Sequence, residues 1–135
     1  MPKKLIIANK LIRDKIPEII KKDGGEPIYF QIFGYPLRRA LFNKIYEELD
    51  ELKQTNDSNC CLEELADVYE VFLNIVKSYC FDIQDVIHAA DIKREEKGGF
   101  DHHFFLKKYI RNDNNSNNND EKEINKIFDN KKNKK

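Results

Sequence analysis

Two short acidic segments constrain the fold and the function of this chain more than any other feature of its sequence. They are Glu48-Leu49-Asp50-Glu51 and Glu64-Leu65-Ala66-Asp67, and twelve residues separate them. Residues three apart lie on one face of a helix, so each segment presents two carboxylates in the same direction. Two such helices packed face to face would bring four carboxylates together, and these cannot all stay ionised without a cation. Mg²⁺ favours carboxylate and phosphate oxygens, so the pattern points to metal-assisted phosphate chemistry.

The bulk composition indicates one domain without an obvious charged partner. The chain has 135 residues, and its 24 Lys and Arg balance its 24 Asp and Glu, which gives no argument for a nucleic-acid or membrane partner. Its three cysteines lack CxxC spacing, which argues against a disulfide framework and a structural zinc site. The apolar run at residues 5–8 is too short for a signal peptide or membrane span. We therefore expect a soluble, cytoplasmic protein.

The composition changes at Arg111. Nine of the last twenty-five residues are Asn, and lysines cluster at the end. Such a segment has too little apolar surface to offset the entropy of ordering. We expect a folded domain over residues 1–110 and a disordered tail over residues 111–135, with only a transient helical turn at Ile124, Ile127 and Phe128.

Apolar spacing of three and four predicts helices in the body. Gly24-Gly25 should stop the first helix, a variant capping box of Asp82 and Asp85 should start the fourth, and Gly98-Gly99 should end it. The four helices are expected at about residues 14–22, 36–53, 62–78 and 83–97. Short connections imply antiparallel neighbours, so we predict an all-α, antiparallel bundle of about four helices.

Three further expectations concern packing. Nine of the twelve residues 65–76 are apolar, so the third helix should be nearly buried all round. Residues 28–33 are β-branched and aromatic and should form an extended piece or a strand. The apolar residues 100–110 should pack back on the bundle as a strand or an irregular arm.

The carboxylates also have a simpler interpretation. Helical charges usually face water, and the third helix offers a plausible solvent stripe at Glu63, Asp67, Glu70, Asn74 and Lys77. Glu48 is different, because it lies at the edge of the apolar stripe of its helix, where a carboxylate without a partner is costly. The spacing alone leaves both interpretations open.

Three motifs in order carry a resemblance. The pattern ExxE, twelve residues, ExxD resembles the metal signature of the MazG-like and phosphoribosyl-ATP pyrophosphohydrolase-like superfamily of all-alpha nucleoside triphosphate pyrophosphohydrolases. The segments Asn9 to Ile20 (NKLIRDKIPEII) and Lys93 to Phe100 (KREEKGGF) resemble the opening and closing segments of one MazG-like branch. The resemblance implies a helical bundle, commonly a homodimer or higher homo-oligomer. It also implies Mg²⁺-dependent hydrolysis of nucleotides to a monophosphate and pyrophosphate, with Mn²⁺ as a possible substitute.

The resemblance assigns roles to particular residues. The implied metal ligands are Glu48, Glu51, Glu64 and Asp67. Glu47 or Glu51 could orient the attacking water, and the sequence does not choose between them. Phosphates need cations, which the flanking motifs offer, unless these are ordinary solvated residues at helix ends. The candidate phosphate-binding residues are Lys10, Arg13, Lys15, Lys93, Arg94 and Lys97.

The motifs do not encode the substrate. Removal of unwanted nucleotides from the cellular pool is the favoured role, and phosphoribosyl-ATP hydrolysis is an alternative. A non-catalytic helical oligomerisation or adaptor module is the rival from another class. It predicts no response to metal.

Overall fold

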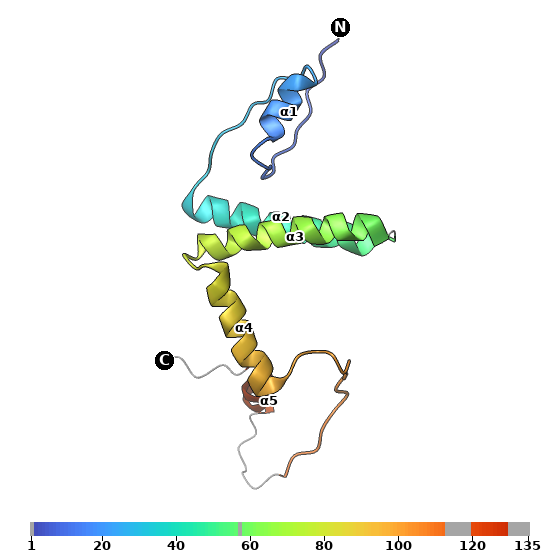
Figure 1. Ribbon diagram of the computed structural model, residues 1–135, viewed down its shortest axis with the longest axis vertical. Coiled ribbons are helices and arrows are strands. Elements are labelled where there is room, and N and C mark those ends of the chain that lie inside the picture. Colours follow the sequence, from blue (N-terminus) through green and yellow to red (C-terminus); the bar gives the residue numbers. More distant parts are fainter. Residues whose placement is uncertain (1, 57, 113–119, 130–135) are drawn as a thin grey trace. The chain divides into compact units, whose positions relative to one another are not determined.

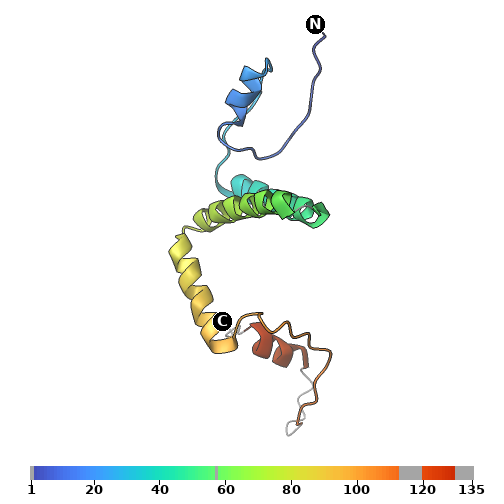
Figure 2. The same ribbon diagram turned by 45° about the vertical axis from the view of Figure 1, so that its right-hand side comes forward.

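The computed structural model describes residues 2–56, 58–112 and 120–129. Its contacts divide the chain into two units, residues 1–98 and 99–135, and each is described by itself. The first unit contains α1 (Ile16–Lys22), α2 (Gly34–Gln54), α3 (Ser58–Ser78) and α4 (Ile83–Lys97), and the second contains α5 (Asp120–Asp129) (Figures 1 and 2). The described residues contain no strand, which confirms the all-α prediction.

Helix α1 ends where its glycines predict. Pro17 occupies the first turn, where a missing N–H costs nothing. After the C-cap Asp23, the backbone N–H of Gly24 donates to Lys21 O at 3.0 Å and that of Gly25 to Ile20 O at 2.8 Å. This is the Schellman pattern, and Gly24 has the positive φ of +87° that it requires. The following residues 25–33 form neither helix nor strand, so the strand considered for residues 28–33 is absent.

Helices α2 and α3 form an antiparallel pair joined by residues 55–57 (Figure 1). Arg38, near the start of α2, ties the two helices together at the opposite end. Its Nη2 donates a 2.7 Å hydrogen bond to the backbone oxygen of Ser78, and its guanidinium lies 4.1 Å from the ring centre of Tyr79. Among the described side chains of this pair, the buried apolar residues are Leu41, Ile75 and Val76.

The prediction that α3 is nearly buried all round is wrong for the single chain. Leu65 is 51% exposed, Tyr69 56% and Phe72 36%. The reason is geometric, because α2 covers one side of α3 and α4 contacts α3 without covering the rest. The exposed residues recur at spacings of three and four and form one continuous face. We call this face, made of Leu62, Leu65, Tyr69 and Phe72, the apolar stripe of α3.

Helix α4 begins and ends as predicted. The side chain of Asp82 accepts a 2.9 Å hydrogen bond from the backbone N–H of Gln84, and that of Asp85 accepts one of 2.9 Å from the N–H of Asp82. At the other end, Gly98 adopts a φ of +82° and its N–H donates to Arg94 O. These two ends fix α4 at Ile83–Lys97.

The second unit contains the segment in which a tail was expected. Residues 99–110 form neither helix nor strand, so the strand considered there is absent, and the packing of this segment against the bundle stays a prediction. Helix α5 contains Ile124, Ile127 and Phe128, so the helical turn predicted there extends to ten residues. The expectation of disorder for residues 113–119 and 130–135 lies outside the described residues. The predicted domain boundary at residue 110 differs from the division at residue 98, and it stays a prediction.

Candidate metal centre

The antiparallel pair brings the two acidic segments together. Glu48 and Glu51 lie in the second half of α2, and Glu64 and Asp67 lie in the first half of α3. Because the connection at 55–57 is short, these halves lie beside each other. One oxygen from each of Glu48, Glu51 and Glu64 falls within a group whose members are all within 4.8 Å of one another. We call these three residues the carboxylate trio.

The three residues of the carboxylate trio differ in how deeply they are buried. Glu48 is buried, with 6% of its surface exposed, Glu64 is half-buried and Glu51 is exposed. The Oε2 atoms of Glu48 and Glu64 are both inaccessible to solvent and have no hydrogen-bond partner among the described residues. Buried polar atoms are nearly always satisfied, so two orphaned oxygens in one cluster need an explanation. A divalent cation, reached from the exposed side at Glu51, would provide one.

The electrostatics of the carboxylate trio are unfavourable without a cation. Burial raises the pKa of Glu48, and the nearby charge of Glu51 raises it further. The pKa of Glu64 is also raised, first by desolvation and then by the charge of Glu51. Asp67 adds to both effects. The site therefore favours an added positive charge, whether a proton or a metal ion.

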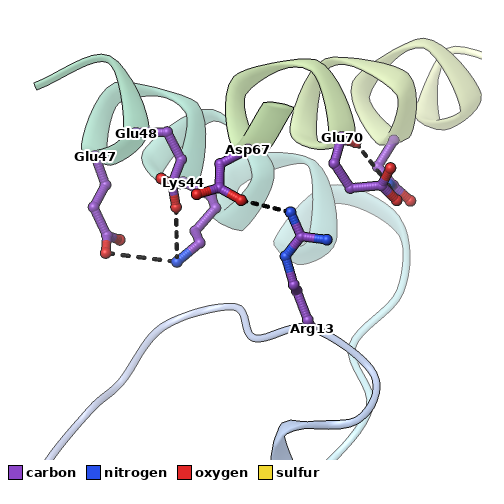
Figure 3. A network of polar contacts seen from close by, with 7 residues as sticks. Arg13, Lys44, Glu47, Glu48, Asp67 and Glu70 are labelled. Atoms are coloured by element: carbon purple, nitrogen blue, oxygen red, sulfur yellow. Dashed lines mark hydrogen bonds and ion pairs between the residues drawn. The ribbon is translucent and has the colours of Figure 1, made fainter. Parts of the chain in front are cut away.

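Lys44 is a member of the site that sequence reasoning missed. Its Nζ lies 3.4 Å from Glu48 Oε1 and 3.5 Å from Glu47 Oε1, and its side chain is only 17% exposed (Figure 3). The lysine thus compensates one oxygen of the buried Glu48, and Oε2 has no partner within residues 2–56, 58–112 and 120–129. The sequence spacing could have identified Lys44, because it precedes Glu47 and Glu48 by three and four positions on one helix.

The opening motif lies against the acidic helices. Lys10 donates a 3.0 Å hydrogen bond from Nζ to Glu47 Oε1, and Arg13 donates one of 2.7 Å from Nη2 to Asp67 Oδ1. Figure 3 shows Arg13 reaching from the N-terminal segment to Asp67 on α3. The fourth predicted ligand therefore holds an arginine and stands outside the carboxylate trio. Glu47 is held by two lysines, and its bond to Lys10 leads the effects that lower its pKa.

The other predicted phosphate-binding residues lie elsewhere in the first unit. Lys15 is exposed at the start of α1. Lys93, Arg94 and Lys97 lie in the last turns of α4, and Arg94 is 3.7 Å from Asp91 of the same helix. Asp67 is eleven residues from the end of α3, roughly 16 Å along its axis, and these residues lie at the far end of the next helix. The closing motif is thus not part of the cluster formed by the carboxylate trio.

A small cleft adjoins the site between the N-terminal segment and α2. Its volume is about 80 Å³, whereas pockets for small ligands usually span hundreds of Å³. This cleft alone is thus smaller than a typical small-ligand site. The lining residues are Asn9, Lys10, Leu11, Ala40, Asn43, Lys44 and Glu47.

Comparison of the chain with protein-family models, with curated proteins and with solved structures finds no match. Among the described helices, none combines the length and the apolar character needed to cross a membrane.

Proposed function

We propose that the chain is a Mg²⁺-dependent nucleoside triphosphate pyrophosphohydrolase that releases pyrophosphate and a nucleoside monophosphate. One observation carries the proposal: three carboxylates from two helices converge, and two of their oxygens are buried with no partner among the residues that the structure describes. Oxygen ligands in this number suit Mg²⁺ or Mn²⁺. The resemblance of the three sequence motifs supplies the reaction class, since a fold alone does not define an activity.

The residues fit a divalent cation in charge and in ligand type. Glu48, Glu51 and Glu64 would hold it, and Asp67 could join them once Arg13 is engaged elsewhere. When bound, the cation would neutralise charge on phosphate oxygens and acidify a water molecule. The exposed position of Glu51 leaves one side of the site open for substrate.

The chain's own side chains would position the substrate and the water. Lys10 and Arg13 lie beside the acidic helices and could transfer their hydrogen bonds to phosphate oxygens. Of the two candidates for orienting the water, Glu47 is the weaker, because its two lysine contacts lower its affinity for a proton. Glu51 is the better candidate. The other predicted phosphate ligands would reach the substrate only through a second copy of the chain or a rearrangement. They are Lys15, Lys93, Arg94 and Lys97.

The test is pyrophosphate release from a panel of canonical and modified nucleoside triphosphates, with and without Mg²⁺. Glu64→Gln removes a member of the carboxylate trio and should abolish metal-dependent release. Glu63→Gln is the matched control, since Glu63 is exposed and is not a member of the trio. Release that persists in Glu64→Gln, or that does not need a divalent cation, would contradict the proposal. Phosphoribosyl-ATP belongs in the panel as the alternative substrate.

A second copy is the proposed partner of the apolar stripe of α3. Leu62 is 70% exposed and Leu65 51%, while the buried apolar residues in the described part of α2 and α3 are Leu41, Ile75 and Val76. A continuous apolar face of this kind typically marks an interaction surface. Size-exclusion chromatography with light scattering should show a dimer or larger homo-oligomer that Leu65→Glu dissociates. A monomeric wild type would contradict this part of the proposal.

The adaptor hypothesis makes the opposite prediction about metal. A helical interaction module would use the apolar stripe of α3 but would gain nothing from a divalent cation. Oligomer formation together with an absent metal response would favour it. A metal response lost in Glu64→Gln would exclude it.

A further inference from the structure

The charges around the carboxylate trio do not balance. Among the residues that the structure describes, ion pairs and mutual charge effects connect eight charged side chains on the N-terminal segment, α2 and α3. Five of them are acids and three are bases, which leaves a deficit of two positive charges. The acids are Glu47, Glu48, Glu51, Glu64 and Asp67, and the bases are Lys10, Arg13 and Lys44.

The deficit is located on the carboxylate trio. Arg13 is 2.7 Å from Asp67 and Lys10 is 3.0 Å from Glu47, so these two acids are each paired with a cation from the N-terminal segment. Lys44 contacts Glu48, which is more than nine-tenths buried and keeps one oxygen without a partner in the described part of the chain. The trio with Lys44 thus carries two uncompensated negative charges, the charge that one divalent cation neutralises.

We infer that Lys10, Arg13 and Lys44 act as built-in counter-ions that limit the resting site to one divalent cation. The inference rests on the proposed metal site and adds its stoichiometry. Without Lys10 and Arg13, the two helices would present five carboxylates against one lysine. The deficit would then be four charges, enough for two divalent cations.

The limit of one divalent cation is reversible because of where the positively charged side chains come from. Lys44 belongs to α2, whereas Lys10 and Arg13 come from a segment outside the helix pair and reach it through exposed ion pairs. Exposed ion pairs are weak and exchange readily. A polyphosphate can compete for both side chains, which would release Asp67 and leave Glu47 with Lys44 alone. A nucleotide carrying its own divalent cation would then provide the second ion as its phosphates take Lys10 and Arg13.

Electron paramagnetic resonance of free Mn²⁺ in equilibrium with the protein measures the stoichiometry directly. The wild type should bind one Mn²⁺ and the Lys10→Gln/Arg13→Gln variant two. The control is Lys3→Gln/Lys4→Gln, which makes the same change of charge in the same segment; Lys3 faces Glu26 at 3.7 Å, and the control should bind one Mn²⁺. Two ions in the wild type, or one in the first variant, would overturn the inference and leave the metal site standing. No bound ion in the wild type would overturn both.

A second variant keeps the test decisive if the double substitution disturbs folding. Lys44→Gln leaves three negative charges on the carboxylate trio, which suits a trivalent cation. The affinity for Tb³⁺ relative to Mn²⁺ should rise by about tenfold or more, because one charge within a few Å is removed. The readout is Tb³⁺ luminescence in competition with Mn²⁺. An unchanged ratio would show that Lys44 does not act as a counter-ion of the site.

Discussion

Arg13 and Asp67 are joined by a 2.7 Å hydrogen bond between residues fifty-four positions apart. The bond links the opening motif to the second acidic segment, two features that have no local connection in the sequence. It also explains why Asp67 stands outside the carboxylate trio although its charge influences both Glu48 and Glu64. The geometry thus couples any ligand of Arg13 to the availability of Asp67.

Divalent cations should stabilise the protein. A cation at 100 times its dissociation constant adds about 2.7 kcal/mol to the free energy of unfolding, which raises the melting temperature by several degrees. Differential scanning fluorimetry with Mg²⁺ and Mn²⁺ should show this rise. Glu64→Gln should abolish it, whereas Asp67→Asn should only reduce it, because Asp67 is held by Arg13. Equal losses in both variants would mean that the four acids act as one ligand set.

Removing Lys44 should destabilise the metal-free protein. Lys44→Gln leaves the buried Glu48 without its cation, which should cost about 1 to 3 kcal/mol in the free energy of unfolding. Urea denaturation followed by circular dichroism measures this loss. Lys53→Gln on the exposed side of α2 is the control and should change stability by less than about 0.5 kcal/mol. Similar effects of the two substitutions would contradict the role given to Lys44.

Arg38 should contribute to the stability of the helix pair. Arg38→Ala removes the hydrogen bond to the Ser78 carbonyl and the contact with the Tyr79 ring, at a cost of about 1 to 3 kcal/mol. Arg39→Ala, at the adjacent exposed position, should be close to neutral. Urea denaturation of both variants checks the difference. If Arg39→Ala lowers the free energy of unfolding as much, the lost stability comes from removing a helix charge and not from the contacts of Arg38 with Ser78 and Tyr79.

The capping box of α4 allows a separate test of the fold. Asp82→Ala removes the acceptor for the backbone N–H of Gln84 and should cost about 0.5 to 2 kcal/mol. Asp91→Ala changes the same charge in mid-helix, where its 3.7 Å contact with Arg94 is exposed and worth little. Thermal melts should give a lower melting temperature for Asp82→Ala than for Asp91→Ala. The reverse order would show that the start of α4 does not depend on this cap.

The sequence predicts the elements because the signals are local. Gly24-Gly25, the box of Asp82 and Asp85, and Gly98 set helix ends through their own backbone, and the structure agrees at all three places. Helix α3 begins at Ser58 and not near Leu62, since residues 58–61 (Ser-Asn-Cys-Cys) gave no apolar periodicity to detect.

The site is less predictable because it depends on contacts between distant residues. The spacing of the carboxylates in the two acidic segments predicted that Glu48, Glu51 and Glu64 lie together, and they do converge. The pairing of Asp67 with Arg13 could not be read from local patterns, since it depends on where the N-terminal segment lies. The exposure of the apolar stripe of α3 was missed because apolar content predicts burial without saying whether the covering surface belongs to the same chain.

The most direct test of the central claim is the position of a bound metal. Crystals grown with Mn²⁺ and measured at the manganese absorption edge would locate the ion by its anomalous signal. We expect a peak within coordination distance of Glu48, Glu51 and Glu64, and none in Glu64→Gln. A peak at another site, or none in the wild type at saturating Mn²⁺, would contradict the account.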